Sequence, residues 1–405
     1  MSFRRDLARR SPQEWAVRLG LAAVAAVLGY YGVTFSLAQV VVKRDPALAY
    51  RLASYDGRIT AVYATSLAGP EATVKDRARA DALAKRALQQ DPTAVAAVAT
   101  LGINADVRGD KAAARRYFAY AQKLSRRDLR TQLFMIEDAV QRNDIPGALH
   151  QYDMTLRVFP TLGDMLYPVL ASASSDPEIR HELVKTLSGK PAWSDRFIRF
   201  IAEKGSDPRS TAALFVGLRR AGVAIPEAAG ADVVNALLGS GQGDGAWSYY
   251  AKIRPGADRG RSRDPRFVSK LERPSKLDWI PVNDDGLTSS IQGGTFDFAA
   301  PASVGGPMLQ QLQLFPPGSY RLSGHSIGIE QAAGALPYWT LRCQNGRELG
   351  RVEVPNSNVA NGNFAGTFSV PADCPVQTLV LTARPSDAVS GLSGQFDRAE
   401  LALVR

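Results

Sequence analysis

Residues 95–128 read VAAVATLGINADVRGDKAAARRYFAYAQKLSRRD. Here and through most of residues 47–253, apolar residues recur three and four positions apart, which predicts successive amphipathic helices. A longer period is superimposed: Pro92 and Pro160 lie two periods of 34 residues apart, with Arg126 midway. An alanine stands twelve residues before each of the three, at Ala80, Ala114 and Ala148. We expect a solenoid of stacked helix pairs, because small alanines let neighbouring helices approach closely.

This 34-residue pattern resembles the tetratricopeptide repeat (TPR), a helix pair with Leu-Gly in its first helix and small and aromatic residues in its second. The middle unit, 95–128, matches best, through Leu101, Gly102, Ala114, Phe118 and Ala121. The flanking units match in part, 61–94 through Ala80 and Pro92, and 129–162 through Ala148, Tyr152 and Pro160. The resemblance implies an all-α solenoid in which these residues pack the repeats and the concave surface binds a protein partner.

Leu19–Val42 is a run of 24 residues without a charged side chain. As a helix it would be roughly 36 Å long, enough to cross a hydrocarbon core of about 30 Å. Arginines precede it, at Arg4, Arg5, Arg9, Arg10 and Arg18. Because basic residues favour the cytoplasmic side, we expect residues 1–18 in the cytoplasm, a transmembrane helix over 19–42 in the inner membrane, and the body in the periplasm of a Gram-negative cell.

The helix itself should begin before this run, since Ser11 and Pro12 suit an N-cap and a first helical turn. A cleaved signal peptide is the alternative, because Ser36 and Ala38 suit a small-residue cleavage site. We favour a retained anchor, because the apolar run exceeds the usual length of a signal peptide's apolar region, about 7–15 residues. Both interpretations export the same body.

Cys343 and Cys374 are the chain's two cysteines, and both fall in one candidate β-domain. An even cysteine count in an exported chain predicts a disulfide. A zinc site is disfavoured, because none of His150, His181 and His325 stands at ligand spacing to either cysteine. We expect no metal and no cofactor.

The net charge of +10 is unevenly spread along the 405 residues. Basic residues concentrate in 1–44 and in 254–276, whereas residues 277–405 are acidic overall. No basic face with interleaved aromatic residues is present, which argues against nucleic-acid binding. Residues 254–276 combine three prolines with dense charge and predict a basic linker. It either leans on anionic lipid headgroups or forms a solvated hinge, and we favour the hinge.

After residue 277 the apolar period changes to two, in short stretches divided by Gly, Pro, Asn and Asp. This predicts an all-β sandwich over 277–405. Alternation places Trp339 and Cys343 on the core face of one strand and Tyr338 on its outer face. In an earlier strand it places Tyr320 inside, with Arg321 and His325 outside.

The β-region resembles the jelly-roll sandwiches of carbohydrate-binding modules. The residues that carry the resemblance are Trp279, the Gly-x-Tyr-x-Leu strand at 318–322, the strand at 364–370, and the pair Phe396 and Asp397. The resemblance implies a binding domain for glycan or protein. In some such modules an acid like Asp397 holds a structural calcium, but the sequence shows no ligand set for one.

Three outward residues are possible ligand-binding positions: Tyr338, Arg321 and His325. Tyr338 is the best candidate for stacking on a sugar or a partner, because its ring is apolar and its hydroxyl polar. For His325 we favour a solvated strand histidine over a ligand contact. Trp339 is expected in the core, and Trp247, Tyr249 and Tyr250 are expected to pack rather than to line a groove.

No catalytic constellation is present in the sequence. The chain has no GxSxG, no GxxxxGK[ST] and no HExxH, and the glycine-rich 239–245 lacks the lysine and hydroxyl of a phosphate-binding loop. It is expected to connect two helices. Asp284 and Asp285 lie in the turn-like NDDG and point to no paired-carboxylate site.

Three hypotheses follow. The first is a non-enzymatic, membrane-anchored scaffold that binds protein through its repeats and glycan or protein through its sandwich, accessory to cell-envelope or exopolysaccharide assembly. The second is a glycan-active enzyme whose acids converge in a cleft; the candidates are Glu178, Glu182, Asp195 and Glu203. The third makes the sandwich a protein-docking or structural cap, and predicts no exposed aromatic platform around Tyr338.

Overall fold

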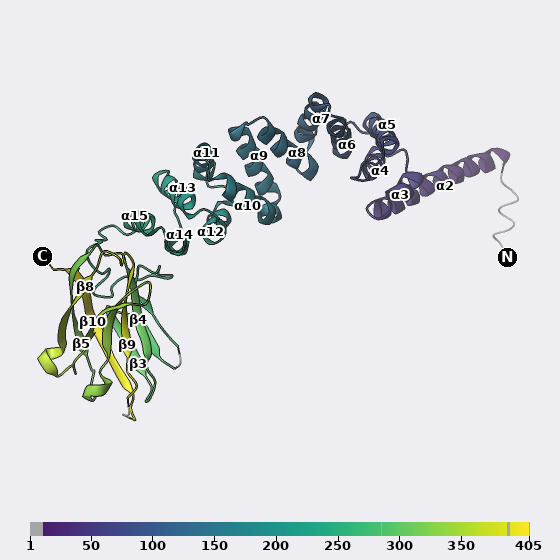
Figure 1. Cartoon of the computed structure of the whole chain (residues 1–405). Helices are drawn as coiled ribbons and strands as arrows, with labels where there is room; N and C mark the ends of the chain where they lie inside the picture. The colour runs from purple at the N-terminus through teal and green to yellow at the C-terminus, as the bar shows by residue number, and fades with distance from the viewer. Residues whose placement is uncertain (1–10, 285, 387–388, 405) are drawn as a thin grey trace, which may run out of the picture. The chain divides into compact units, whose positions relative to one another are not determined.

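The computed structural model describes residues 11–284, 286–386 and 389–404. The chain divides into two compact units, residues 1–161 and 162–405, and each is described by itself. Figure 1 labels the helices of the N-terminal part and the strands of the C-terminal part. The helical region predicted over 47–253 is therefore divided between the two units. Arg4, Arg5, Arg9 and Arg10 of the predicted basic N-terminus, and Asp285 of the predicted turn, lie outside the described residues.

Helix α2 (Pro12–Val41) begins at the predicted cap, where the Ser11 hydroxyl accepts a hydrogen bond from the Glu14 amide at 3.3 Å. It has 30 residues and is long and apolar enough to span a membrane. Only Thr34 and Ala38 are buried among its residues. The chain thus has one apolar helix near its N-terminus, seven residues longer at its start than the span predicted from the uncharged run.

The rest of the first unit is a series of short helices joined by tight connections. They are α3 (Pro46–Leu52), α4 (Gly57–Ser66), α5 (Val74–Gln90), α6 (Val95–Val107), α7 (Lys111–Leu124), α8 (Leu129–Gln141) and α9 (Ile145–Val158).

Two of the helix pairs, α6–α7 and α8–α9, repeat at an interval of 34 residues. Gly109 and Asn143 both have positive φ, 81° and 53°, at the same point of the connection. Asp110 and Asp144 then cap the second helix of each pair, their side chains accepting from the amides of Ala113 and Gly147. The period predicted from the sequence is therefore present in the backbone. Membership of the TPR family stays a prediction.

Most of the predicted repeat-packing residues are buried. These are Ala80, Leu101, Gly102, Ala114, Phe118, Ala121, Ala148 and Tyr152. The Phe118 ring lies against Gly102, where a Cβ atom would come within 2.9 Å of the ring. Pro92 and Pro160 are exposed and follow the ends of α5 and α9, so they end helices rather than pack between them.

The second unit begins with helices and continues into strands. Its helices are α10 (Gly163–Ala173), α11 (Pro177–Ser188), α12 (Ser194–Lys204), α13 (Pro208–Arg220), α14 (Glu227–Gly239) and α15 (Gly243–Ile253), and a short 3₁₀ turn, η1 (Pro160–Leu162), precedes them. The glycine-rich segment 239–245 connects α14 to α15, as predicted. Tyr249 and Tyr250 are buried packing residues, also as predicted.

Two five-stranded antiparallel sheets follow. Sheet A has the order β2-β3-β10-β5-β8 and sheet B the order β1-β4-β9-β6-β7. The strands are β1 (Ile280–Pro281), β2 (Thr288–Gln292), β3 (Thr295–Ala300), β4 (Gly306–Gln313), β5 (Gly318–Ile327), β6 (Tyr338–Cys343), β7 (Glu348–Glu353), β8 (Asn363–Val370), β9 (Gln377–Ala383) and β10 (Leu392–Leu403).

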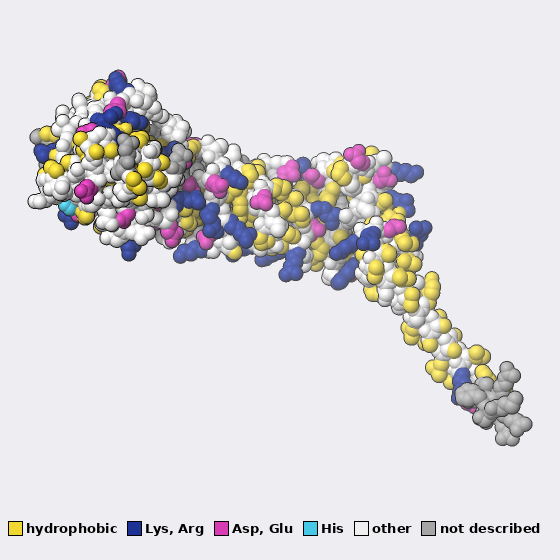
Figure 2. Space-filling model, turned by 90° about the horizontal axis from the view of Figure 1, so that it is seen from below, with side chains coloured by type: hydrophobic (Ala, Val, Ile, Leu, Met, Phe, Trp, Pro, Cys, Tyr) yellow, Lys and Arg dark blue, Asp and Glu magenta, His cyan; other side chains and the backbone are white. Residues whose placement is uncertain are grey.

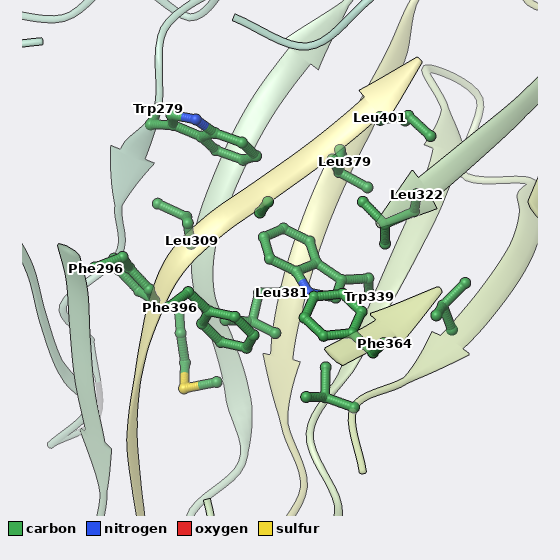
Figure 3. Packing of buried hydrophobic residues seen from close by; sticks show 14 of the residues in the cluster. Trp279, Phe296, Leu309, Leu322, Trp339, Phe364, Leu379, Leu381, Phe396 and Leu401 are labelled. Carbon is green, nitrogen blue, oxygen red and sulfur yellow. The ribbon is translucent and has the colours of Figure 1, made fainter. Parts of the chain in front are cut away.

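The two sheets pack face to face over one hydrophobic core (Figure 3). Trp339 of sheet B is fully buried, and its ring centroid lies 5.9 Å from that of Phe396 in sheet A. The predicted disulfide is present: Cys343 at the end of β6 is bonded to Cys374 in the connection from β8 to β9. The β-sandwich expected from the period-two pattern is thus confirmed.

Residues 254–276 do not form the predicted solvated hinge. The Arg263 side chain is buried and donates hydrogen bonds to the carbonyls of Leu277, at 2.7 Å, and of Leu312. Phe267 is 1% exposed and belongs to the sandwich core. Ser262 exchanges hydrogen bonds with the backbone of Leu401 in β10. The buried guanidinium is stable here because carbonyl oxygens satisfy its donors, so the segment packs on the sandwich as part of it.

Candidate functional site

The outer surface of sheet A carries a row of mostly polar side chains, which ends at the apolar Ile327. Cross-strand register aligns Ser290 of β2 with Asp297 of β3, Asp297 with Gln395 of β10, and Gln395 with Ile327 of β5. Residues directly opposite one another in antiparallel strands share a face. The alternate residues of β3, Phe296 and Phe298, point into the core. This row therefore lies on the solvent side of the sheet.

The row forms the floor of a hollow of about 640 Å³. Its polar lining residues are Asn283, Thr288, Ser289, Ser290, Asp297, Ser393 and Gln395. We call this surface, together with His325 and Asp397 beside it, the polar face. It offers hydroxyl, amide and carboxylate groups, which both donate and accept hydrogen bonds. Such a mixture suits a ligand rich in hydroxyl groups.

His325 and Asp397 form the next row of the polar face. The His325 Nδ1 atom lies 2.9 Å from Asp397 Oδ1, and both side chains are partly exposed. Asp397 is the extra residue of a bulge in β10, where the register to β5 shifts between Phe396 and Arg398. A bulge re-aims a side chain, and here it places the carboxylate beside the imidazole. Gly362, with φ of 73°, lets the chain pass close to the His325 Nε2 atom.

The structure brings two of the three predicted ligand-binding residues to one face and separates the third. Arg321 and His325 both lie on the outer side of β5 in sheet A. Tyr338 lies in β6 of sheet B. Sequence alternation identified outward residues in each strand, but it carries no information about which sheet a strand joins.

The Tyr338 ring is already in contact with two cations. The guanidinium carbon of Arg351 is 4.2 Å from the ring centroid and that of Arg384 is 4.9 Å from it. Both arginines are ion-paired in turn, Arg351 with Glu348 and Arg384 with Glu353. A sugar ring would have to displace these contacts to stack on Tyr338. This arrangement fits a structural role for the tyrosine better than an open stacking platform.

The residues that sequence reasoning missed are the small polar ones of β2, β3 and β10. Ser290, Asp297 and Gln395 carry no strong signal, because such side chains occupy most solvated strand faces. Alternation in TFDFAA does place Asp297 opposite the buried phenylalanines. That pattern was the available sign that Asp297 faces outward.

A second hollow of about 1280 Å³ lies where residues 254–278 pass the turn between β2 and β3. Buried at its edge, Asp278 accepts from the Tyr250 hydroxyl at 2.6 Å and from the Ser275 hydroxyl at 2.7 Å. Burial raises the pKa of Tyr250, and the neighbouring Asp278 raises it further. Burial also lowers the pKa of Arg263 to about 10. The Asp278 carboxylate thus accepts hydrogen bonds from side chains of the protein itself. We therefore assign the cluster to the packing of α15 and residues 254–276 on the sandwich.

The described residues contain no group of three or more His, Cys, Asp or Glu side chains placed to hold a metal ion. Asp397, which the sequence offered as a possible calcium ligand, pairs with His325 instead.

The acids of the enzyme hypothesis lie on helices α11 and α12. Glu178, Asp195 and Glu203 are exposed, and Glu182 pairs with Lys185 at 2.6 Å.

No protein-family model matches the chain, and no curated protein matches it. Among solved structures, a CBM4 carbohydrate-binding module aligns with 35% of this chain and 99% of its own, at 12% identity and a TM-score of 0.27. TmCBM61 in complex with β-1,4-galactotriose aligns with 37% of this chain and 99% of its own, at 14% identity and a TM-score of 0.25. The enzymatically active domain of tailspike protein 4 from bacteriophage CBA120 aligns with 36% of this chain and 21% of its own, at 12% identity and a TM-score of 0.23.

Proposed function

We propose that this chain is a membrane-anchored, non-enzymatic adaptor that binds a glycan through the polar face and a protein partner through its helix pairs. In this proposal it is accessory to cell-envelope or exopolysaccharide assembly. The observation that carries the glycan part is the polar face itself. Hydroxyl, amide and carboxylate side chains from β2, β3, β10 and the loop before β2 converge on one hollow. Among the described residues that line it, no ion pair is present, in contrast to the ion-paired arginines around Tyr338.

The helix pairs support the protein-binding part. Stacked helix pairs present an extended surface that can bind a partner without any catalytic group. The first unit carries exposed apolar and aromatic side chains of the kind found at protein interfaces, among them Val74, Val107 and Tyr120. We assign partner binding to this unit.

Export to an oxidising compartment is supported by two features. Helix α2 is long and apolar enough to span a membrane, and the disulfide between Cys343 and Cys374 is typical of proteins outside the cytosol. A single-pass anchor in the inner membrane with the body in the periplasm is our proposal for its orientation.

The placement of the four acids of the enzyme hypothesis supports a non-catalytic role. Three of them are exposed on α11 and α12, and none of the four lines either of the two hollows described above, whereas catalytic groups are expected in a concave pocket.

The test is polysaccharide binding by the full-length protein in detergent, measured by affinity electrophoresis against neutral and acidic polysaccharides. The polar-face variants are Asp297→Ala and Gln395→Ala. Matched control variants on the opposite sheet are Tyr338→Ala and Arg351→Ala. Loss of one hydrogen bond to a charged group costs about 1.5–3 kcal/mol, so Asp297→Ala should weaken binding roughly tenfold or more.

Unchanged affinity in the Tyr338→Ala protein together with loss in the Asp297→Ala protein would locate the site on the polar face. The reverse result would move the site to sheet B, and no binding by the unaltered chain would reject the glycan part. A pull-down from solubilised membranes with the Asp297→Ala protein tests the division of roles, because protein partners should then be retained while glycan is lost.

A further inference from the structure

Helix α2 is longer than the hydrocarbon core of a bilayer. Its 30 residues extend for about 45 Å, against a core of about 30 Å. A straight helix of this length must tilt in the membrane or leave part of itself outside. The residues around its last three turns indicate where the C-terminal end of α2 lies relative to the bilayer.

One face of these turns is covered by the chain itself. Helix α3 packs on α2, and in the connection after α3 the Tyr55 hydroxyl donates to the Tyr31 carbonyl at 3.4 Å, with the two ring centroids 5.5 Å apart. Thr34 and Ala38 on the same face are 7% and 0% exposed. Ala38 packs in a small core with Ala49 of α3. The end of α2 is therefore an integral part of the first unit.

The opposite face stays apolar and uncovered. Val33, Leu37 and Val40 are 61%, 49% and 77% exposed. Their spacing of four and three residues puts them in one stripe along the helix. The stripe continues the apolar surface of the preceding turns, and hydrophobic side chains cover α2 along its length in Figure 2.

The covered side carries a charge and an interfacial aromatic residue. Arg51 in α3 is an exposed cationic residue, and Tyr55, which follows α3, is 47% exposed. Cations are costly in hydrocarbon but favourable beside anionic headgroups, and tyrosine is enriched at that depth. The two sides of the same three turns thus suit different layers of a bilayer.

We propose that the stripe formed by Val33, Leu37 and Val40 lies on lipid, while α3 lies on the aqueous side with Arg51 among the headgroups. Helix α2 then crosses the membrane obliquely, and the first helices of the unit are attached to the bilayer surface. The occupant of the stripe is the acyl and headgroup boundary of a bilayer that contains anionic lipid. This inference rests on the membrane anchor proposed above.

The test places single nitroxide labels on the full-length chain in phosphatidylcholine–phosphatidylglycerol nanodiscs. The sites are Val40→Cys and Leu37→Cys on the stripe, Arg51→Cys on α3, Val24→Cys in the middle of α2, and Tyr120→Cys on α7. The native cysteines are joined in a disulfide and will not take up label. Collision with oxygen reports contact with lipid, and collision with a water-soluble nickel chelate reports contact with water.

We expect the labels at 37 and 40 to favour oxygen as the label at 24 does, with a collision ratio several-fold above that of the labels at 51 and 120. Chelate access at 40 equal to that at 120 would overturn the inference. Protection from both reagents at 37 and 40 would assign the stripe to a protein contact and would also overturn it. Chelate access at 24 is a separate outcome, because it would reject the membrane anchor itself.

Discussion

The Arg115 guanidinium donates a hydrogen bond to the Asp138 carboxylate at 2.7 Å, from α7 to α8. Thirty-four residues earlier in the chain, Asp81 of α5 accepts a hydrogen bond from the Asn104 amide of α6, also at 2.7 Å. The same two positions thus join successive helix pairs, although the acid stands at the first position in one contact (Asp81) and at the second position in the other (Asp138). A contact that persists while its chemistry changes indicates that the helix packing fixes the position.

Replacing Asp138 should destabilise the first unit. Burial raises the pKa of this carboxyl, but hydrogen bonds from Arg115 and Arg142 outweigh burial and hold the pKa below its usual range. Asp138→Ala should cost about 1–3 kcal/mol in local opening free energy, measured by amide hydrogen exchange in α7 and α8. Because the folded pKa is lowered, the contribution is present above about pH 4 and is lost as the pH falls through the folded value. The neighbouring, exposed Glu137→Ala is the control and should cost less than about 0.5 kcal/mol.

Adding one methyl group at Gly102 should loosen the α6–α7 pair. The new Cβ would lie 2.9 Å from the Phe118 ring, which stacks on Phe134 with centroids 4.1 Å apart. We expect Gly102→Ala to lower exchange protection in α6 and α7 by about 1–3 kcal/mol, despite the better helix propensity of alanine. Gly69→Ala, where no atom lies within 4 Å, is the matched variant and should have little effect. Equal behaviour of the two would contradict the packing assignment.

Removing the disulfide should destabilise the sandwich alone. Cys343 and Cys374 are 31 positions apart, and closing a loop of that length restricts the unfolded chain by about 3–4 kcal/mol in the entropic description. The Cys343→Ala/Cys374→Ala protein should therefore show faster exchange in β6, β8 and β9. Helices α4 to α9 should keep their protection, and a matching loss there would indicate general misfolding.

The second unit should lose stability in alkali. Burial raises the pKa of Tyr249 to about 12, and burial followed by the charge of Asp278 raises the pKa of Tyr250. For groups with a raised folded pKa, the contribution is full below the unfolded value of about 10 and is lost as the pH rises through the folded values. The Tyr249→Phe/Tyr250→Phe protein should start less stable but show a flatter decline from pH 10 to 12 in thermal melts. An unchanged slope would assign the decline to other groups.

Much of the fold could be predicted because the decisive signals are local. The 34-residue spacing predicted a helix pair over 95–128, and the structure has α6 and α7 within those bounds. Alternation around Trp339 predicted which side of its strand is buried, since side chains of a strand point to opposite faces.

Residues 254–276 could not be interpreted in the same way. A densely charged segment is expected to be exposed to solvent when no hydrogen-bond acceptors for its side chains can be recognised in the sequence. The acceptors for Arg263 are the carbonyl oxygens of Leu277 and Leu312. The second of these lies 49 positions away, so it becomes adjacent only when the sandwich forms.

The candidate site was predictable only in part. His325 and Arg321 were placed correctly on an outer face, because alternation is a property of one strand. The guanidinium groups over Tyr338 come from β7 and from the residue that follows β9, and the neighbours of Asp297 come from β2 and β10. Contacts of this kind depend on strand order, which no local pattern records.

Strand β10 lies between β3 and β5, at the centre of sheet A, although it is the last strand of the sandwich in chain order. Until residues 392–403 emerge, β3 and β5 each present an open edge, and Ser262 lacks its partner Leu401. Newly synthesised chains therefore pass through an interval in which these edges are free to pair wrongly. A chaperone that shields these edges during that interval would improve the yield of folded protein more than one that assists the helices. The helices contact partners that are only a few tens of residues away in the sequence, so they can pack as soon as they are made.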